Sequence, residues 1–542
     1  MTAFTGTARL TRLALRRDRV KLLVWALAVP GVGAAVAQSV AGIYATESDR
    51  IGYATTSAAS VVARAFNGPV SGPSLGSVVT AEAYTTLALL AALLSTFAVV
   101  RHTRQNEETG RAELLGSAVV GRHAPLTAAL LTVLAANLLS GLLLALALAA
   151  GGLPMAGSLA LGAAIAGIGV SFAAVAAVTA QISGTARGAN GMAAAVVGLA
   201  FLLRAAGDAW GTVSADGMRV VSAWPSWISP LGWANQVRAF DGNRWPVLAL
   251  TAGFALLAVG TAFVLTAHRD LGSGVLAVRR GPAVAAGSLL SPGGLAWRLQ
   301  RGVVLGWAIG VVVMGLSMGS VGDQLDSFVG ENEAASELIT QLGGTDKLTD
   351  AFLGTMMAMF ALAVAGFAVQ AVLRLRTEEA TGALEGILAT AVSRPRWLLS
   401  HLLWAALGTV ALLTLAGAST GLGYGLVTGD VPGQVARLTV AGLVQAPAAL
   451  VVTGLVVVLF GLLPRLSVAL SWSAFLLCVV LGQLGALLEL PQPVLNLSPF
   501  THLPAVPAAD PSATPMVVLL GVAVALTALG LATFRRRDLA VG

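Results

Sequence analysis

The chain contains 542 residues, of which 56% are hydrophobic and only 11% are charged, whereas about 25% of the residues in a soluble domain are charged. This composition excludes an ordinary soluble protein and indicates a chain that crosses a membrane many times. The formal net charge of +7 does not indicate a nucleic-acid partner, because the basic residues follow membrane topology. Cys478, the single cysteine, excludes an internal disulfide bond. The five scattered histidines indicate no metal site.

The first element in the chain is a basic segment, Arg9–Lys21, in which leucines are interspersed among arginines. This pattern predicts an amphipathic helix on the inner membrane surface, followed by an apolar span at Leu22–Ile43. A cleaved signal peptide is the alternative, because Ala35-Val36-Ala37 resembles a cleavage site. The same pattern recurs in mid-chain, where Trp297–Arg301 precedes Gly302–Val321. No signal peptide lies at such a position, so an uncleaved span is favoured.

Apolar runs of about 20 residues recur along the chain, which is the length that a helix needs to cross the hydrocarbon layer. A membrane β-barrel would give weaker, alternating segments, so helices are predicted. The predicted spans are Leu22–Ile43, Tyr84–Val100, Pro125–Ala150, Leu159–Ile182, Gly191–Ala206 and Pro246–Ala267 in the first half, and Gly302–Val321, Leu353–Leu373, Leu398–Leu422, Leu438–Leu463, Val468–Leu488 and Pro515–Phe534 in the second. We therefore predict an all-α polytopic membrane protein with 12 transmembrane helices.

The loops between these spans alternate in charge. Most of the 32 lysine and arginine residues fall before the first span, after the last span and in every second loop. Because basic residues stay on the cytoplasmic side, this distribution places both termini in the cytoplasm. An even number of spans in each half gives the two halves the same orientation.

Two polar segments, Arg101–Pro125 and Arg374–Pro395, interrupt the apolar sequence in the same way. Glu113 and Glu385 are 272 residues apart, and so are Arg122 and Arg394. Two further landmarks recur in the same order, namely Ser229-Pro230 with Ser498-Pro499 and Arg269-Asp270-Leu271 with Arg537-Asp538-Leu539. This order predicts a tandem duplication, with one six-helix repeat at residues 1–271 and a second, parallel repeat at 272–542.

Each polar segment has the composition of a short helix on the membrane surface. A Thr-Gly step breaks the preceding helix, and a glutamate follows in the first turn of the next, where the helix dipole favours an anion. A proline then turns the chain back into the membrane. The candidate site residues are Glu107, Glu108, Thr109, Gly110, Glu113 and Arg122 in the first segment, and Glu378, Glu379, Thr381, Gly382, Glu385 and Arg394 in the second.

Such a helix with preceding glutamates resembles the coupling helix of ABC-2 type transporter permeases, and Arg536–Leu539 is similar to the C-terminal end of that family. The two-repeat organisation resembles the fused permeases of high-GC bacteria that are named polyketide antibiotic or tetronasin-type exporters. The resemblance implies that the polar segments dock on two copies of a separate cytosolic ATPase, which would bind ATP and Mg. It also implies export of amphipathic or hydrophobic compounds, such as antibiotics, drugs or lipids. The alternative interpretation is that the polar segments are only solvent-exposed turns between two spans, without a binding partner.

The sequence contains no P-loop of its own. The phosphate cradle of a P-loop requires a glycine before the lysine, and neither Lys21 nor Lys347 follows a glycine. We therefore expect that the chain is not an enzyme, holds no cofactor and depends on a partner for ATP hydrolysis.

A substrate path is less clearly marked. Met356, Met357, Met359 and Phe360 gather flexible apolar side chains in one span, and methionine surfaces adapt to varied ligands, although ordinary packing explains them equally simply. The family resemblance would place the path between the second and fifth spans of each half. That adds Phe97, Phe201, Trp472 and Phe475 as candidates.

Two other functions remain open. An ion-coupled carrier normally holds ionisable residues in the middle of its spans, whereas Glu82 and Arg204 are predicted at span edges and the interior polar residues, such as Gln370 and Gln445, are neutral. A membrane scaffold without transport activity would tolerate charge reversal at Glu113 and Glu385.

Overall fold

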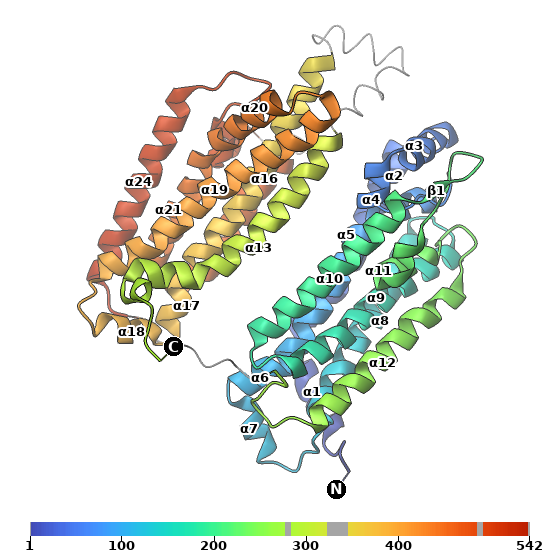
Figure 1. Cartoon of the computed structure of the whole chain (residues 1–542), viewed down its shortest axis with the longest axis horizontal. Helices are drawn as coiled ribbons and strands as arrows, with labels where there is room; N and C mark the ends of the chain where they lie inside the picture. The colour runs from blue at the N-terminus through green and yellow to red at the C-terminus, as the bar shows by residue number, and fades with distance from the viewer. Residues whose placement is uncertain (1, 277–282, 322–344, 485–490, 540–542) are drawn as a thin grey trace. The chain divides into compact units, whose positions relative to one another are not determined.

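The computed structural model describes residues 2–276, 283–321, 345–484 and 491–539. The described chain is helical apart from one two-stranded hairpin, and it divides into two compact units, unit 1 (1–281) and unit 2 (282–542). Figure 1 shows each unit as a bundle of long helices with shorter helices at its ends.

Unit 1 consists of long helices that alternate with shorter helices and one hairpin. They are α1 (Thr7–Arg17), α2 (Arg19–Ile43), α3 (Glu47–Ala59), α4 (Val61–Phe66), α5 (Leu75–His102), α6 (Arg104–Glu108), α7 (Arg111–Gly116), α8 (Ala124–Ala150), α9 (Met155–Ile182), α10 (Ala186–Ala209), β1 (Thr212–Val213), β2 (Val220–Val221), η1 (Trp224–Ile228), α11 (Pro230–Gln236), η2 (Trp245–Val247) and α12 (Leu248–Ala267). The strands pair antiparallel, with Thr212 opposite Val221.

Unit 2 repeats the succession of long helices. Its described elements are η3 (Gly287–Leu290), α13 (Pro292–Val321), α16 (Thr345–Val372), α17 (Arg374–Ala380), α18 (Ala383–Leu388), α19 (Arg394–Thr428), α20 (Val431–Val444), α21 (Ala446–Leu462), α22 (Ser467–Leu484), α23 (Gln492–Leu495), η4 (Pro499–His502) and α24 (Ala513–Arg536).

Eleven helices within the described residues are long and apolar enough to cross a membrane. The prediction of an all-helical polytopic membrane protein is therefore confirmed. The predicted span at Val468–Leu488 corresponds to α22, whose apolar part, Ser467–Gly482, is shorter. Its predicted end at Leu488 lies outside the described residues.

Several predicted boundaries are wrong by more than a turn. The span predicted at Tyr84–Val100 is part of the longer helix α5, which already begins at Leu75. The span predicted at Leu438–Leu463 is divided at Gln445 into α20 and α21. Pro447, in the first turn of α21, explains this break, because proline cannot donate a backbone hydrogen bond within a continuing helix.

Small residues allow the long helices to pack closely. A Cβ atom added to Gly141 in α8 would lie 2.5 Å from the carbonyl oxygen of Gly162 in α9. In unit 2, a Cβ atom on Gly417 in α19 would lie 2.1 Å from the carbonyl oxygen of Leu438 in α20. Backbone contact of this kind is typical of membrane helices, where dispersion contacts replace the hydrophobic effect as the main source of association.

Candidate functional site

Each polar segment folds as an elbow at the end of a long helix. In unit 1, α5 ends at His102 and is followed by the short helices α6 and α7; in unit 2, α16 is followed by α17 and α18 (Figure 1). Gly110 and Gly382 lie immediately before α7 and α18 with φ angles of 70° and 76°. Glycine adopts this left-handed conformation without the steric cost that other residues meet. The predicted breaks at the two Thr-Gly steps are thus confirmed.

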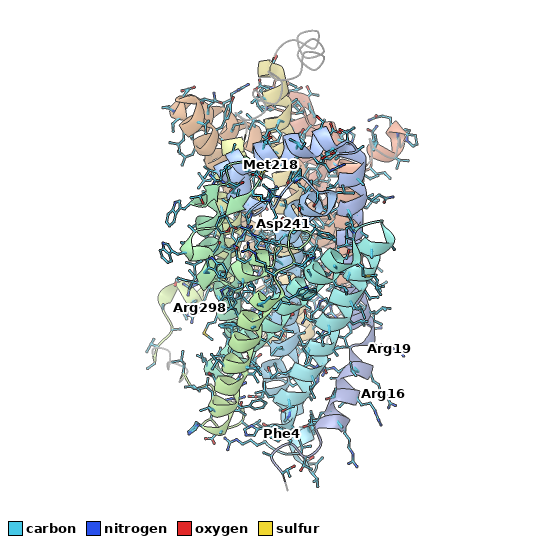
Figure 2. The ribbon with its side chains drawn as sticks, turned by 90° about the vertical axis from the view of Figure 1, so that its right-hand side faces the viewer. Phe4, Arg16, Arg19, Met218, Asp241 and Arg298 are labelled. Carbon is cyan, nitrogen blue, oxygen red and sulfur yellow. The ribbon has the colours of Figure 1, made fainter. Side chains whose placement is uncertain are left out.

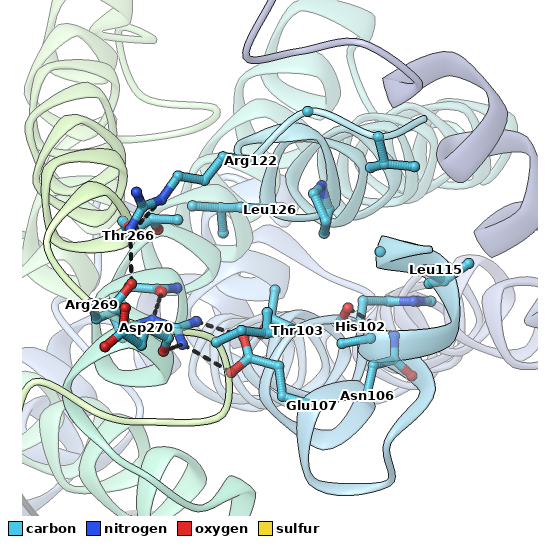
Figure 3. A pocket seen from close by; sticks show the side chains of 17 residues that line it. His102, Thr103, Asn106, Glu107, Leu115, Arg122, Leu126, Thr266, Arg269 and Asp270 are labelled. Carbon is cyan, nitrogen blue, oxygen red and sulfur yellow. Dashed lines mark hydrogen bonds and ion pairs between the residues drawn. The ribbon is translucent and has the colours of Figure 1, made fainter. Parts of the chain in front are cut away.

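Glu107 fastens the elbow of unit 1 to the chain that follows its last long helix, α12. Its carboxylate accepts two hydrogen bonds from Arg269, at 2.5 Å and 2.9 Å (Figure 3). It also accepts one from Arg104 at 2.8 Å and one from the backbone N–H of Gly272 at 3.2 Å. The side chains of Glu107 and Arg269 are each 8% exposed. A two-pronged ion pair of this kind fixes geometry as well as charge.

Glu379 fastens the elbow of unit 2 in the same way. Its carboxylate, which is fully buried, accepts hydrogen bonds of 2.5 Å and 2.9 Å from Arg537 and one of 3.4 Å from Arg376. The Arg537 guanidinium also lies 5.0 Å from the ring centre of Phe460 and 5.2 Å from that of Phe534. We call these two ion pairs, Arg269–Glu107 and Arg537–Glu379, the latches.

Arg122 and Arg394 complete the connection from the far end of each polar segment. Arg122 donates to the carbonyl oxygens of Thr266 at 3.0 Å and Arg269 at 2.8 Å. Arg394 donates to the carbonyl oxygen of Arg537 at 2.6 Å and more weakly to that of Phe534 at 3.4 Å. The last carbonyl groups of a helix lack partners within it and attract cations. Both arginines therefore cap the end of the long helix that the latch also holds.

The predicted site residues differ in accessibility. The exposed members are Glu108, Thr109, Glu113, Arg122, Thr381 and Glu385; Gly110, Gly382 and Arg394 are partly buried; the carboxylates of Glu107, Glu378 and Glu379 are enclosed in ion pairs. A partner protein that approached the elbows would meet Glu113 and Glu385, which stand in the first turns of α7 and α18.

The two glutamate pairs do not match residue for residue. The 272-residue offset matches Glu107 with Glu379. The carboxylate of Glu378 instead accepts hydrogen bonds from Arg374 at 3.1 Å and from the Trp397 indole at 3.3 Å. Glu378 is buried, whereas Glu108 is exposed. The arginine partners were missed as site residues, although Arg104 and Arg376 are also 272 residues apart and the two Arg-Asp-Leu landmarks contain Arg269 and Arg537.

The elbow of unit 1 is additionally held by the N-terminal residues. The backbone N–H groups of Gly121 and His123 donate to the carbonyl oxygens of Thr5 and Ala3, each at 2.9 Å, and the Phe4 ring lies 5.6 Å from the His123 ring. Figure 2 places Phe4 at the same end of unit 1 as Arg16 and away from Met218. The amphipathic helix predicted at Arg9–Lys21 is present as α1, which ends at Arg17 and packs against α8. Its position on the membrane surface stays a prediction.

Two cavities lie behind α7 in unit 1. One, of about 370 Å³, is lined in part by Glu107, Leu115, Arg122 and Arg269 (Figure 3). The second, of about 240 Å³, lies beside α1 and shares Leu115 with the first. No side chain of α7 is buried, whereas Leu384 of α18 is fully buried in the core of unit 2.

The structure does not bring the candidate substrate-path residues into these cavities. Met357 and Phe360 are buried in the core of unit 2, whereas Phe97 and Met359 are exposed. The other candidates are not fully buried, and each contacts another aromatic ring or the hydrophobic core of its unit. They are Phe201, Met356, Trp472 and Phe475. Their role in a substrate path stays a prediction.

Arg204 forms a buried ion pair in the last turns of α10, which ends at Ala209. The residue was predicted at a span edge; its side chain is 1% exposed and lies 3.4 Å from the fully buried carboxylate of Asp208. Arg204 also donates to the Phe66 carbonyl oxygen at 3.1 Å. Buried charges are retained in membrane proteins when they are paired. The ion pair lies within α10, and the hydrogen bond to Phe66 joins α10 to the end of α4.

The fold and the apolar helices define the chain as a multi-pass membrane protein. A family model described as the C-terminal domain of the multidrug efflux system permease Rv1217c matches residues 289–535. The chain is also 43% identical over 539 residues to the multidrug efflux system permease protein Rv1217c of Mycobacterium tuberculosis, covering 99% of this chain and 95% of the relative. The chain therefore belongs to the Rv1217c family of permeases, and it is a multi-pass protein of the bacterial inner membrane.

Proposed function

We propose that this chain is the membrane subunit of an ATP-binding-cassette exporter of the ABC-2 type, which moves amphipathic or hydrophobic compounds out of the cell. A separate cytosolic ATPase, present as two copies, would supply the energy and would bind ATP and Mg. The name of the 43% identical relative supports efflux of drugs as the activity. The chain's own sequence lacks the Gly-Lys-Ser/Thr signature of a P-loop, which supports a partner ATPase.

The observation that carries the proposal is the repetition of one elbow in both units. Each elbow presents an exposed glutamate, Glu113 or Glu385, on a short helix, and each is latched by a buried glutamate to the end of the unit's last long helix. A polar turn that only met solvent would not require a buried two-pronged ion pair, because burying charges is costly. A segment that transmits force requires such a rigid connection.

The proposed topology has twelve spans in two parallel six-helix repeats, 1–271 and 272–542, with both termini in the cytoplasm. The matched order of helices in the two units supports the repeat, since α5–α8 and α16–α19 are joined through elbows of the same design. The eleventh span would contain α22. The exposed arginines of α1 and the arginines that end α24 support a cytoplasmic position for both ends.

In this mechanism the two ATPase subunits close on ATP and displace α7 and α18. The latch of unit 1 would transmit the displacement of its elbow to α12, and the latch of unit 2 would transmit it to α24. The helices α5 and α16 would move together with the elbow helices that are attached to their ends. This concerted movement would switch the permease between inward-facing and outward-facing states.

Gentle purification of the tagged chain from its native host tests the proposal. We expect a P-loop ATPase at about two copies per chain, with ATP hydrolysis that survives purification and is lost when the conserved lysine of the partner's P-loop is replaced. If purification preserves other membrane complexes but yields no ATPase, and export collapses with the proton gradient while ATP remains, an ion-coupled carrier replaces the proposed exporter.

A further inference from the structure

The smaller of the two cavities in unit 1, of about 240 Å³, is enclosed by α1, α7 and the start of α8. It lies at the level where the apolar spans α2, α5 and α8 begin or end. Arg17 is the last residue of α1, just before α2, and it donates a hydrogen bond of 3.1 Å to Asn106, which follows the end of α5. Figure 1 shows α1, α6 and α7 at one end of unit 1, away from α3. The cavity therefore lies where lipid headgroups meet the ends of membrane helices.

The cavity walls carry positive charge that no acid of the walls balances. Arg17 and Arg111 line the cavity, and no aspartate or glutamate does. Within the described part of the chain, neither arginine forms an ion pair. Asp18, the acid next to Arg17 in the chain, is already paired with Arg101 at 2.5 Å and with His102 at 2.8 Å. Two guanidinium groups thus face one space without a negative partner, which favours an anionic ligand.

Apolar side chains form the rest of the walls. Leu13 of α1 and Leu114 of α7 line the cavity and are 50% and 76% exposed. Leu10 and Leu115 extend the same apolar lining. Exposed apolar surface rimmed by charges is typical of a contact with a membrane or another partner. Because α7 buries none of its own side chains, a ligand that covered these leucines would also hold α7 in place.

We propose that this cavity is a binding site for one anionic phospholipid. Its phosphate would pair with Arg17 and Arg111, because a guanidinium group binds phosphate oxygens through parallel N–H groups. An acyl chain of the same lipid would cover Leu13 and Leu114. A free anion such as inorganic phosphate matches the charge but leaves the leucines exposed, and a zwitterionic lipid matches the leucines but not the charge.

The bound lipid would connect α1 to α7 and so support the elbow of unit 1 from the membrane. The elbow of unit 2 has a different support, because Leu384 of α18 is fully buried in the protein core. The counterparts of the two arginines and of the exposed leucine of α7, 272 residues later, are Leu289, Ala383 and Gly386. Neither the paired cations nor that leucine is repeated, so the lipid would act on one elbow only.

Native mass spectrometry of the full chain in an uncharged detergent, titrated with phosphatidylglycerol, tests this site. Arg17→Gln/Arg111→Gln removes both charges and should weaken phosphatidylglycerol binding by about tenfold or more. Arg12→Gln/Arg16→Gln is the matched control, because it removes two exposed charges of α1 that do not line the cavity, and it should bind the lipid like the native chain. Arg17→Lys/Arg111→Lys keeps both charges and should retain most of the affinity, which separates loss of charge from a folding defect.

Hydrogen exchange in lipid nanodiscs measures whether the lipid holds α7. Exchange at the amides of residues 114–117 should be slower when the nanodiscs contain phosphatidylglycerol than when they contain phosphatidylcholine alone. Arg17→Gln/Arg111→Gln should remove this difference. Inorganic phosphate added to the phosphatidylcholine nanodiscs should give no protection, because it has no acyl chain to cover Leu114.

Three results would overturn the inference. The first is equal phosphatidylglycerol affinity in Arg17→Gln/Arg111→Gln and the native chain, and the second is an equal loss in the control Arg12→Gln/Arg16→Gln. The third is full protection of α7 by inorganic phosphate, which would show a site for a free anion instead of a lipid. No ATPase is present in these measurements, so their outcome is independent of the purification test of the exporter proposal.

Discussion

The elbows α6–α7 and α17–α18 have the same latch but different support. In both units a buried glutamate binds an arginine that follows the last long helix. Behind α18 lies the core of unit 2, which Leu384 enters completely. The matching position in α7, 272 residues earlier, is Ala112, which lines the larger cavity.

This difference shows that both repeats retain the ion pair between the elbow and the end of the last long helix. The apolar packing behind the elbow is not the same in the two repeats. The elbow of unit 2 is stabilised by burial of a large apolar side chain, which contributes free energy wherever it is removed from water. The elbow of unit 1 depends instead on hydrogen bonds that Gly121 and His123 donate to the N-terminal residues. We therefore expect the two elbows to respond unequally to matched substitutions.

The largest effect should come from breaking the latches. Arg537→Ala removes the two-pronged partner of the fully buried Glu379, and it should lower the free energy of unfolding by about 3 kcal/mol or more. Arg269→Ala should cost less, about 2 kcal/mol, because Glu107 keeps Arg104 at 2.8 Å. Unfolding in mixed detergent micelles with SDS measures both values. Addition of Glu379→Gln to Arg537→Ala should recover part of the loss; a double variant less stable than Arg537→Ala would contradict the latch.

A pair of reciprocal substitutions tests the packing difference. Leu384→Ala should destabilise unit 2 by about 2–4 kcal/mol, because it empties a filled core position. Ala112→Leu should stabilise unit 1 by about 1 kcal/mol, because its added carbons would fill existing space. The same SDS titration measures the two changes, and a loss of stability in Ala112→Leu would show that the cavity is not available to a side chain.

Gly121→Ala tests the role of the N-terminal residues in unit 1. A Cβ atom at Gly121 would lie 2.3 Å from the Ala3 carbonyl oxygen, so the two backbone hydrogen bonds to residues 3 and 5 should be lost, at a cost of about 1–2 kcal/mol. Hydrogen exchange should become faster at the amides of residues 121 and 123. Gly116→Ala is the control, since a Cβ atom there meets open space and should leave exchange at these amides unchanged.

The smallest effect on stability is expected at the exposed glutamates. Glu113→Lys and Glu385→Lys should each change the free energy of unfolding by less than about 0.5 kcal/mol, because both side chains are exposed. Each should nevertheless reduce the amount of ATPase that co-purifies, with the double variant lowest. Asp510→Lys reverses an exposed charge outside the polar segments and should retain the ATPase. Normal export by the double variant would exclude these glutamates from coupling.

The sequence predicted the helical membrane fold and the location of the elbows because both depend on local patterns. Apolar runs of membrane length, Thr-Gly breaks and the 272-residue offset are visible without coordinates. The latches were not predicted, since the Glu107–Arg269 and Glu379–Arg537 contacts join residues more than 150 positions apart and no local pattern selects one arginine among 30. The start of α5 at Leu75 was missed for a simpler reason: the polar residues in its first turns hid the beginning of the helix.

Cross-linking from the two elbows tests the central claim most directly. In a Cys478→Ser background, Glu113→Cys and Glu385→Cys give single exposed thiols on α7 and α18. With a short bifunctional reagent, we predict that both variants cross-link to the co-expressed ATPase and that Asp510→Cys does not. Cross-linking that is absent from both elbows, in a complex that still hydrolyses ATP, would contradict the assignment of the polar segments as the ATPase contact.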